Sequence, residues 1–420
     1  MLRLQGINAI LAIVAVFMVL HLGFAPEHHT TRTTLTTMLG GVAFLLMTAS
    51  VILSTRLGFL EELFGGLDRM YQVHRIAGTM VGIFVIVHFV GVPKVLPEGV
   101  DPVANPLNPS SPLGKVAMVL LVIGIFVALN RKISYSKWRN PHKIMALVYV
   151  LTIGHFMNAP GVFFERFSVS GYYLIATALI GTIALIYTMA GMNKRTATAF
   201  TIEKVNPLER ATEIVLKPKS SMFDFKPGQF AFLEVQGKGW NEPHPFTISS
   251  PPSEDRLRFT LKVLGDWTRK VREELKPGGD VIVRGPYGRF DAATSKSKKQ
   301  VWIAGGIGLT PFLSKIRAMK PGDERDIHFV YAARNKEEAI FLDELKERTA
   351  ELSNVTLYPL FSDEGEFARI DVAKDRLPGQ LGDYEYFICG PKPMVDGLMK
   401  DLRKEGVERR KIHTEAFEFR

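Results

Sequence analysis

The sequence predicts an α-helical membrane bundle of six spans, followed by a small antiparallel β-barrel and an α/β domain built on a parallel sheet. Long apolar runs fill the first 192 of 420 residues, and 47% of all residues are hydrophobic, which is high for a soluble protein. Short alternating strands follow from Ala199, and after Lys299 the pattern becomes strand, glycine turn and helix. We therefore predict three domains, over residues 1–195, 196–297 and 298–420.

The six predicted spans are each long enough to cross a hydrocarbon core of about 30 Å, the fifth only barely. They cover residues 7–24, 35–55, 74–92, 113–130, 142–158 and 171–192. The first run is also compatible with a signal peptide. No small-residue cleavage site precedes Ala25 and Pro26, however, which favours an uncleaved span.

The lysines and arginines of this half gather in alternate loops. One set of loops holds eleven: Arg3, Arg56, Arg69, Arg75, Arg131, Lys132, Lys137, Arg139, Lys143, Lys194 and Arg195. The opposite loops hold four: Arg32, Lys94, Lys115 and Arg166. The positive-inside rule then predicts a multi-pass protein of the cell membrane with both termini in the cytoplasm. The net charge of +10 is thereby explained by topology, and no basic cluster interleaved with aromatic residues predicts nucleic-acid binding.

Two predicted spans each carry two histidines. His74 and His88 are 14 residues apart, and His142 and His155 are 13 apart. Because four helical turns take about 14.4 residues, each pair returns to one face of its helix. Imidazole is expensive in lipid unless it is ligated or paired, and two neutral imidazoles satisfy the iron of a b-type haem. The sequence therefore predicts an inner site of His74 with His142 and an outer site of His88 with His155.

Other readings of the polar residues in this half remain open. Lipid headgroups also satisfy interfacial histidines, and this applies best to His142, which stands beside Pro141. Three histidines without partners at matching depth are expected to be surface or structural residues: His21, His28 and His29. Three arginines stand where the propionates of an inner haem need cations, although they also serve as topological anchors: Arg56, Arg75 and Arg139. A single cysteine excludes an intrachain disulfide and a thiolate-held cluster.

Two segments of the predicted barrel are suited to hold a cofactor. The run from His244 to Ser250 reads HPFTISS, in which proline fixes the backbone and hydroxyls can hold a polar ring edge. An ordinary strand end can read the same way. The run from Gly265 to Thr268 opens a helix whose free N–H groups suit a pyrophosphate, although an ordinary N-cap looks similar.

The last third of the chain carries the signals of a nucleotide-binding sheet. Gly305, Gly306 and Gly308 lie between an apolar strand and a helix that begins at Thr310 and Pro311, where backbone can approach a phosphate closely. Arg334 follows the next strand, and a cation there favours the 2′-phosphate of NADPH over NADH. Cys389, Gly390 and Pro391 end a later strand, at the edge where such sheets bind ligands.

These motifs, in this order and over almost the whole chain, resemble the NADPH oxidase and ferric reductase superfamily, and HPFTISS, GDWT and the terminal AFEFR are most similar to prokaryotic NADPH oxidases. The resemblance implies a six-helix di-haem domain joined to a dehydrogenase module of the ferredoxin-reductase kind. It implies FAD contacts at His244, Pro245, Phe246, Thr247, Ser249, Lys262, Gly265, Trp267 and Thr268. It implies NADPH contacts, with NADH possible, at Gly305, Gly306, Gly308, Thr310, Pro311, Arg334, Gly390 and Pro391.

The resemblance also implies catalytic positions and departs from the family at two points. Cys389 would meet the nicotinamide end, and Phe417 or Phe419 would stack on the flavin; core packing is the alternative for each. Soluble reductases usually have arginine where His244 stands. No calcium-binding loop precedes the first span, so we expect activity without an obligatory regulatory subunit.

The cofactors order the expected reaction. A hydride carries two electrons and a haem accepts one, so the flavin converts between them, and electrons leave for oxygen beyond the membrane as superoxide. A ferric or other metal-chelate reductase is the alternative, as is a membrane subunit that supplies an extracytoplasmic partner protein. The outer loops, about residues 25–34, 93–112 and 159–170, show no metal-binding cluster, which favours oxygen.

Overall fold

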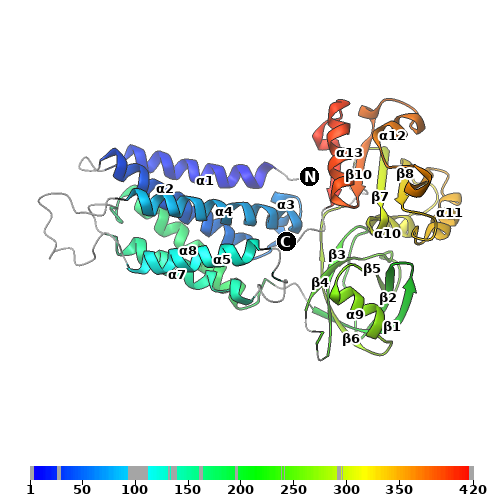
Figure 1. Cartoon of the computed structure of the whole chain (residues 1–420), viewed down its shortest axis with the longest axis horizontal. Coiled ribbons are helices and arrows are strands. Elements are labelled where there is room, and N and C mark those ends of the chain that lie inside the picture. The colour runs from blue at the N-terminus through cyan, green and yellow to red at the C-terminus, as the bar shows by residue number, and fades with distance from the viewer. Residues whose placement is uncertain are drawn as a thin grey trace, which may run out of the picture. The chain divides into compact units, whose positions relative to one another are not determined.

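The structure is a computed structural model that describes residues 4–25, 30–92, 112–130, 133, 140–159, 164–193, 197–237, 239–240, 242–290, 295 and 297–415. Contacts within the chain divide it into two compact units, one ending at Asn193 and one beginning at Lys194. The first unit is helical and the second contains two sheets with helices packed on them (Figure 1).

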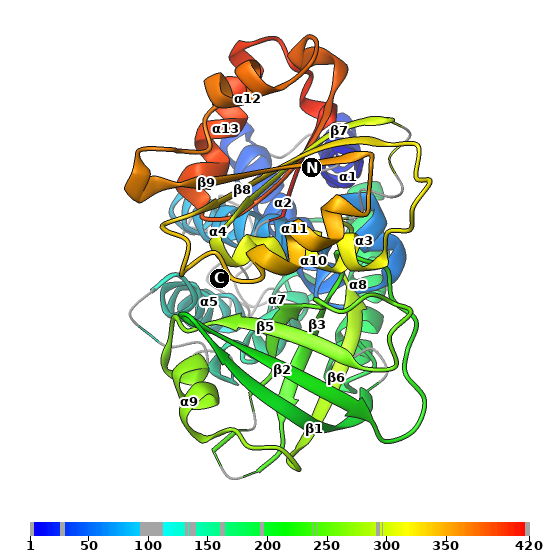
Figure 2. The same cartoon turned by 90° about the vertical axis from the view of Figure 1, so that its right-hand side faces the viewer.

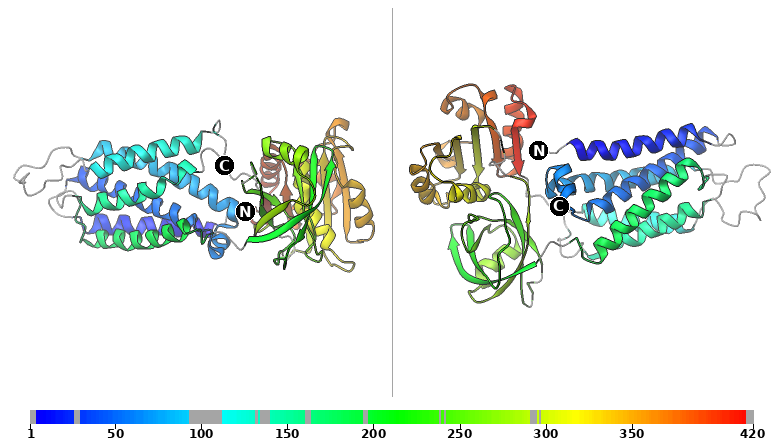
Figure 3. Two further views of the ribbon diagram at one scale, coloured as in Figure 1. Left: turned by 90° about the horizontal axis from the view of Figure 1, so that it is seen from below. Right: turned by 180° about the vertical axis from the view of Figure 1, so that it is seen from behind.

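The first unit is a bundle in which the long helices lie side by side (Figure 3). Its helices are α1 (Leu4–Gly23), α2 (Thr31–Leu53), α3 (Gly58–Phe64), α4 (Leu67–Gly91), α5 (Pro112–Leu129), α7 (Met145–Met157) and α8 (Val169–Met189). Within the described residues, five of these are long and apolar enough to cross a membrane: α1, α2, α4, α5 and α8. Large apolar side chains such as Val19, Phe126 and Ile183 stay exposed, as expected of a lipid-facing surface.

The predicted fifth span is not confirmed as a full crossing. Its regular helix, α7, has only 13 residues, which gives a length of about 20 Å against about 30 Å of hydrocarbon. Lys143 and Ile144 form a turn closed by bonds to Asn140 and Pro141, three residues back, so the segment holding His142 is separate from α7. The described residues therefore give five helices long and apolar enough to cross a membrane, where the sequence predicted six spans.

The second unit begins with a curled antiparallel sheet. Its strands are β1 (Ala197–Leu208), β2 (Ala211–Pro218), β3 (Phe230–Val235), β4 (His244–Thr247), β5 (Leu257–Lys262) and β6 (Asp280–Tyr287), in the order β4-β3-β6-β1-β2-β5. Helix α9 (Asp266–Glu274) follows β5. Ile248, directly after β4, bridges to Phe259 of β5, which brings the two edge strands together. The antiparallel architecture is confirmed, and the closed barrel stays a prediction.

The second sheet of this unit is parallel, as predicted, with helices on both faces (Figure 2). Its strands are β7 (Lys299–Gly305), β8 (Asp326–Ala333), β9 (Val355–Phe361), β10 (Glu385–Cys389) and β11 (Ile412–Glu415), in the order β11-β10-β7-β8-β9. Its main helices are α10 (Thr310–Ala318), α11 (Leu342–Ala350), α12 (Ile370–Arg376) and α13 (Lys392–Lys404). Trp302 of β7 packs in the core with α10 and α11, and its neighbour Ile303 packs in the core with α13, as strand alternation requires.

Candidate functional sites

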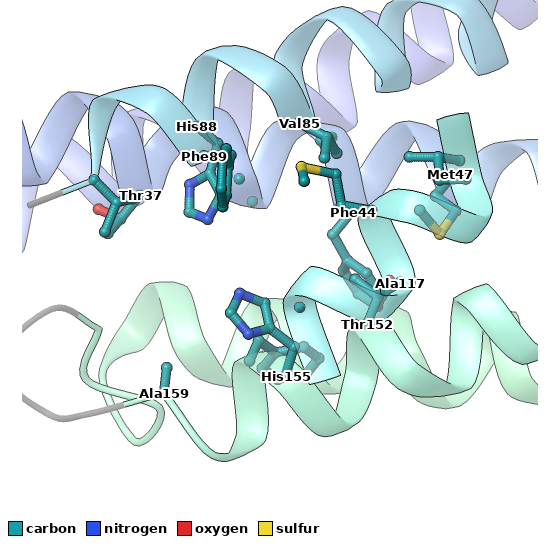
Figure 4. A pocket seen from close by; sticks show the side chains of 18 of the residues that line it. Thr37, Phe44, Met47, Val85, His88, Phe89, Ala117, Thr152, His155 and Ala159 are labelled. Carbon is teal, nitrogen blue, oxygen red and sulfur yellow. The ribbon is translucent and has the colours of Figure 1, made fainter. Parts of the chain in front are cut away.

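The four predicted membrane histidines meet in two pairs. His88 of α4 and His155 of α7 face one another across a cavity (Figure 4), with ring centroids 6.2 Å apart and planes at 76°. His74 and His142 repeat this arrangement at 6.2 Å and 70°. Two imidazoles that bind one metal from opposite sides stand roughly 6 Å apart, because the metal–nitrogen bond is about 2 Å and the nitrogen lies about 1 Å from the ring centre. Both pairs therefore have the spacing of axial ligands.

The two histidines of α4 are held in the tautomer that a metal ligand needs. Nδ1 of His88 lies 2.8 Å from the carbonyl oxygen of Thr36, and Nδ1 of His74 lies 3.0 Å from that of Ser50. A carbonyl only accepts, so each Nδ1 donates and each Nε2 keeps its lone pair for a metal. Both carbonyls belong to α2, where they are spaced by the same 14 residues as the histidines.

Two glycines make room for the outer pair. A Cβ atom at Gly40 of α2 would lie 2.8 Å from Nδ1 of His88, and one at Gly114 of α5 would lie 2.7 Å from Nδ1 of His155. Both distances are too short for a real contact. Nδ1 of His155 is buried and has no hydrogen-bond partner among the described residues.

The cavity at the outer pair fits a haem. Its lining includes apolar side chains such as Phe44, Met47, Val85 and Leu121, together with a few polar ones. Within the described parts of the chain, no group of three or more His, Cys, Asp or Glu side chains could hold a bare ion. A metal placed between two histidines here would bring its own equatorial ligands, as haem iron does.

The remaining polar residues of the bundle are placed as follows. Nε of Arg56 donates to the hydroxyl of Tyr71 at 2.8 Å, and the Tyr71 ring lies 6.4 Å from that of His74, so this predicted cation is near the inner pair. His21 is buried, with 4% exposure, so of the two predicted roles, surface or structural, the surface role is wrong. Three other residues of this prediction lie outside the described residues: His28, His29 and Arg139.

An aromatic cluster in the curled sheet gathers several residues predicted to hold FAD. The ring of Trp267 lies 4.2 Å from that of His244 and 5.6 Å from that of Phe246. Oγ1 of Thr247 and Nε1 of Trp267 are buried without a hydrogen-bond partner among the described residues. Buried polar groups are normally satisfied, so these two atoms fit the polar edge of a bound cofactor.

Other residues of the FAD prediction have local roles. Oγ1 of Thr268 accepts from the amide of Gly265 at 3.0 Å and so closes the first turn of α9. Oγ of Ser249 lies 3.3 Å from Oγ1 of Thr260 in the buried core. Lys262 is exposed at the end of β5.

The glycine turn after β7 packs directly on the turn after β10. A Cβ atom at Gly308 would lie 2.3 Å from the carbonyl oxygen of Cys389, and one at Gly305 would lie 2.9 Å from Cδ of Pro391. Gly306 has a φ of +54°, which L side chains rarely adopt. The structure thus joins the two predicted nucleotide segments at the carboxyl edge of the sheet, where such folds bind dinucleotides.

The start of α10 completes this edge. Oγ1 of Thr310 donates to the carbonyl of Ile307 at 3.2 Å, and Pro311 lies in the first helical turn, where no intrahelical donor is needed. Gly390 packs on the backbone of Gly305, to whose Cα its Cβ would lie 3.1 Å away. Thr310 therefore lies beside the glycine turn, with its amide already bonded to the carbonyl of Ile307.

Cys389 and Arg334 lie at the same edge in contrasting environments. Cys389 is fully buried, and its burial, followed by the nearby Glu415 carboxylate, raises the pKa of the thiol well above its ordinary value. This environment favours a packed, protonated thiol over a nucleophile. Arg334 is 58% exposed, and its Nε lies 3.3 Å from Oδ1 of Asp363 after β9. Phe417 and Phe419 lie outside the described residues.

Sequence reasoning missed how α10 is tied to the flavin motif. Arg317 donates to the carbonyl of Ser249 at 2.9 Å and binds both carboxylate oxygens of Glu344, at 2.6 and 2.7 Å. Oγ of Ser314 donates to the carbonyl of Ser250 at 2.7 Å. The helix that follows the glycine turn therefore also fixes the end of HPFTISS. The only signal was a polar stripe on an otherwise ordinary helix.

Comparison with known proteins gives three matches to successive parts of the chain. Residues 39–153 match a "Ferric reductase like transmembrane component", residues 198–303 an "FAD-binding domain" and residues 302–400 an "Oxidoreductase NAD-binding domain". A flavohemoprotein of Rhizobium meliloti is 30% identical over 240 residues, which are 52% of this chain and 60% of that protein. A reductase component of propane 2-monooxygenase from Rhodococcus jostii is 28% identical over 46% of this chain and 56% of that protein.

One solved structure shares the fold over most of its length. The flavohemoglobin of Malassezia yamatoensis, with bound FAD and haem, superposes with a TM-score of 0.54 over 92% of this chain and 99% of its own, at 19% identity. At that identity the likeness concerns the fold alone. The chain spans little more than half of the length of the curated relatives named above.

Proposed function

We propose that the chain carries electrons from cytoplasmic NADPH, through FAD and two b-type haems, to oxygen on the far side of the membrane, and that the oxygen leaves as superoxide. The premise is that the chain belongs by domain architecture to the NADPH oxidase and ferric reductase superfamily. The matched domains by themselves are those of a membrane-bound oxidoreductase with FAD- and NAD(P)-binding domains. The proposal adds the haems, the acceptor and the direction.

The observation that carries the proposal is that two pairs of histidines have the same geometry. Both have ring centroids 6.2 Å apart, and both α4 histidines present Nε2 because an α2 carbonyl takes the hydrogen of Nδ1. His74 with His142, and His88 with His155, would each hold one haem. Such a group supplies one-electron chemistry at a position inside the bilayer.

In the nucleotide-binding unit, the chain's own residues bind and orient the reactants. The Thr247 hydroxyl and the Trp267 indole N–H would hold polar edges of FAD, since both are buried without a partner among the described residues. The glycine turn around Gly306, which has a positive φ, would receive the dinucleotide phosphates. Arg317 holds the two sites in register through the carbonyl of Ser249.

The lining of the outer cavity favours oxygen as the acceptor. Among the described lining residues the polar side chains are His88, His155, Thr37, Lys115 and Thr152, and the rest are apolar or glycine. With a haem held between the two histidines, a small neutral molecule can approach its edge through such side chains without losing strong hydration, whereas a charged ferric chelate would have to be desolvated. The same argument predicts that external chelates are reduced slowly.

Purified protein supplied with NADPH and FAD tests the proposal. We expect dye reduction that superoxide dismutase suppresses, and we expect a ferric chelate under nitrogen to be reduced more slowly than oxygen is consumed in air. Dismutase-insensitive reduction, with rapid chelate reduction without oxygen, would assign the protein to the metal-chelate reductases instead.

A further inference from the structure

A buried histidine outside the two pairs connects the outer cavity to the surface of the bundle. His21 of α1 is 4% exposed, and its ring stacks on that of Phe17, with centroids 5.5 Å apart. Nε2 of His21 lies 3.1 Å from Oγ1 of Thr37, and Nδ1 lies 3.3 Å from Oγ of Ser170. An ionisable group at membrane depth is expensive to bury, so a buried histidine there points to a function.

Hydroxyl groups lie within hydrogen-bond distance of the imidazole on both sides, at Ser170 and at Thr37. Oγ of Ser170 lies 3.2 Å from Oγ of Ser168, which is only partly buried. The Ser168 hydroxyl donates to the carbonyl of Glu165 at 2.6 Å, so it must turn before a proton passes from it to Ser170. Ser168, Ser170, His21 and Glu165 line a small cavity of their own at this end of the bundle. On the other side of the His21 imidazole, Thr37 lines the outer cavity and lies beside His88 (Figure 4).

The hydrogen bonds of His21 set the direction in which a proton can pass through its imidazole. Nε2 of His21 also lies 3.2 Å from the carbonyl oxygen of Thr34, and a carbonyl only accepts, so Nε2 carries the hydrogen. Nδ1 is then the acceptor that faces Ser170. A proton arriving from Ser170 at Nδ1 would release the one on Nε2 towards Thr37, that is, from the surface towards the cavity.

Thr37 is placed to pass that proton on. Of the other hydroxyls among the described lining residues, that of Thr152 donates to the carbonyl of Val148 in its own helix, at 2.8 Å. The Thr37 hydroxyl donates to the carbonyl of Thr33 at 2.8 Å, which leaves its oxygen to accept from Nε2 of His21.

We propose that Ser168, Ser170, His21 and Thr37 form a proton relay that protonates the reduced acceptor in the outer cavity. This inference rests on the proposed function. Oxygen takes one electron that originates from NADPH, and the resulting anion takes the proton of the Thr37 hydroxyl, so that an O–H bond forms in neutral hydroperoxyl. Thr37 regains a proton from Nε2 of His21, and the imidazole regains one at Nδ1 through Ser170 and Ser168 from solvent. Neutralisation favours release, because an anion is poorly solvated among apolar side chains.

Stopped-flow reoxidation of the NADPH-reduced full chain by oxygen, in H2O and in D2O, tests the relay. His21→Phe keeps the ring stacking, Thr37→Val keeps the volume, and Ser170→Ala breaks the path one step further out. For each we expect reoxidation to slow by about 10²-fold, the lower end of what a positioned acid contributes. The wild type should reoxidise more slowly in D2O and the slowed variants should not share that dependence. Haem content and the rate of flavin reduction by NADPH should stay at wild-type values.

The control is Thr33→Val, which removes another buried α2 hydroxyl, one that bonds Thr30 at 3.0 Å and lies outside the path. Haem-loaded relay variants that reoxidise at the wild-type rate, or a control slowed as much as Thr37→Val, would overturn the relay and leave the proposed function standing. A wild type without haem, or one that oxygen does not reoxidise, would instead refute the proposed function.

A spectroscopic readout independent of turnover completes the test. In ¹⁵N-histidine-labelled full chain, the signals lost in His21→Phe should be those of an Nε2–H tautomer, and a Nδ1–H tautomer would contradict the direction of transfer. Added imidazole should partly restore reoxidation in His21→Ala, where the adjoining small cavity is enlarged, and not in Thr37→Val.

Discussion

Gly40→Ala is the substitution whose effect on the outer histidine pair follows most directly from the structure. The new Cβ would lie 2.8 Å from Nδ1 and 2.9 Å from Cε1 of His88, whereas favourable contacts between carbon atoms lie at about 3.5–4.0 Å. The His88 ring must therefore move by several tenths of an ångström, away from the helix whose Thr36 carbonyl holds it at 2.8 Å.

The magnitude follows from two effects. Overpacking a well-filled site costs about 1–3 kcal/mol, and a weakened hydrogen bond adds about 0.5–1.5 kcal/mol. Since about 1.4 kcal/mol is a factor of ten, the outer site should lose about 10- to 10³-fold in haem affinity. The inner pair should be unaffected, because neither His74 nor His142 is among the contacts of this Cβ.

The assay is haem transfer from the purified protein to excess apomyoglobin, combined with a redox titration of the haem that remains. Gly40→Ala should release one of its two haems much faster than the wild type does, and Gly114→Ala should repeat this through His155. Gly23→Ala is the matched control, because Gly23 is exposed at the end of α1 and a Cβ there meets nothing within 4 Å. Two haems per chain with wild-type release in Gly40→Ala would refute the geometry.

Three further predictions concern the nucleotide-binding unit. Asp363→Asn should raise the NADPH to NADH ratio of kcat/KM by about fivefold or more. The reason is that a carboxylate beside Arg334 repels a 2′-phosphate and accepts a hydrogen bond from a 2′-hydroxyl. An unchanged ratio would contradict this. Cys389 is the single cysteine and is fully buried, so mass spectrometry should find the native chain unlabelled by iodoacetamide; rapid labelling would show an accessible thiolate. Burial lowers the pKa of His328, and Asp326 has a smaller opposite effect. The stabilising contribution of His328 is therefore present above pH 6.5 and is lost as the pH falls through the lowered pKa. His328→Phe should flatten the fall in Tm between about pH 7 and pH 5.

Features that recur with a helical or strand period could be predicted from the sequence. The 14-residue spacing of His74 and His88 placed both on one face of α4, and the structure brings each to a partner. The glycine turn and the turn after Cys389 were predicted at one sheet edge, because carboxyl ends of parallel strands meet there, and they pack within contact distance.

Features that depend on one helix packing against another could not be predicted. The carbonyls of Thr36 and Ser50 hold the α4 histidines, yet any residue has a carbonyl, so they leave no sequence signal. Gly40 acquires its role only when α2 lies against His88. The path through His21 likewise joins three helices that are far apart in the sequence, α1, α2 and α8.

The short α7 shows a further limit of apolar run length. The run from His142 to Asn158 is apolar enough for a barely sufficient span, but Pro141 and the turn at Lys143 delay the regular helix to Met145. Hydropathy alone does not register this turn.

The central claim is that four histidines hold two haems in two separate tiers, and the haem content of the purified chain tests it most directly. The reduced-minus-oxidised spectrum should show b-type bands with two haems per chain in the wild type and one in each of His74→Ala and His88→Ala. A wild-type spectrum without b-type bands, or full haem content in both variants, would contradict the account.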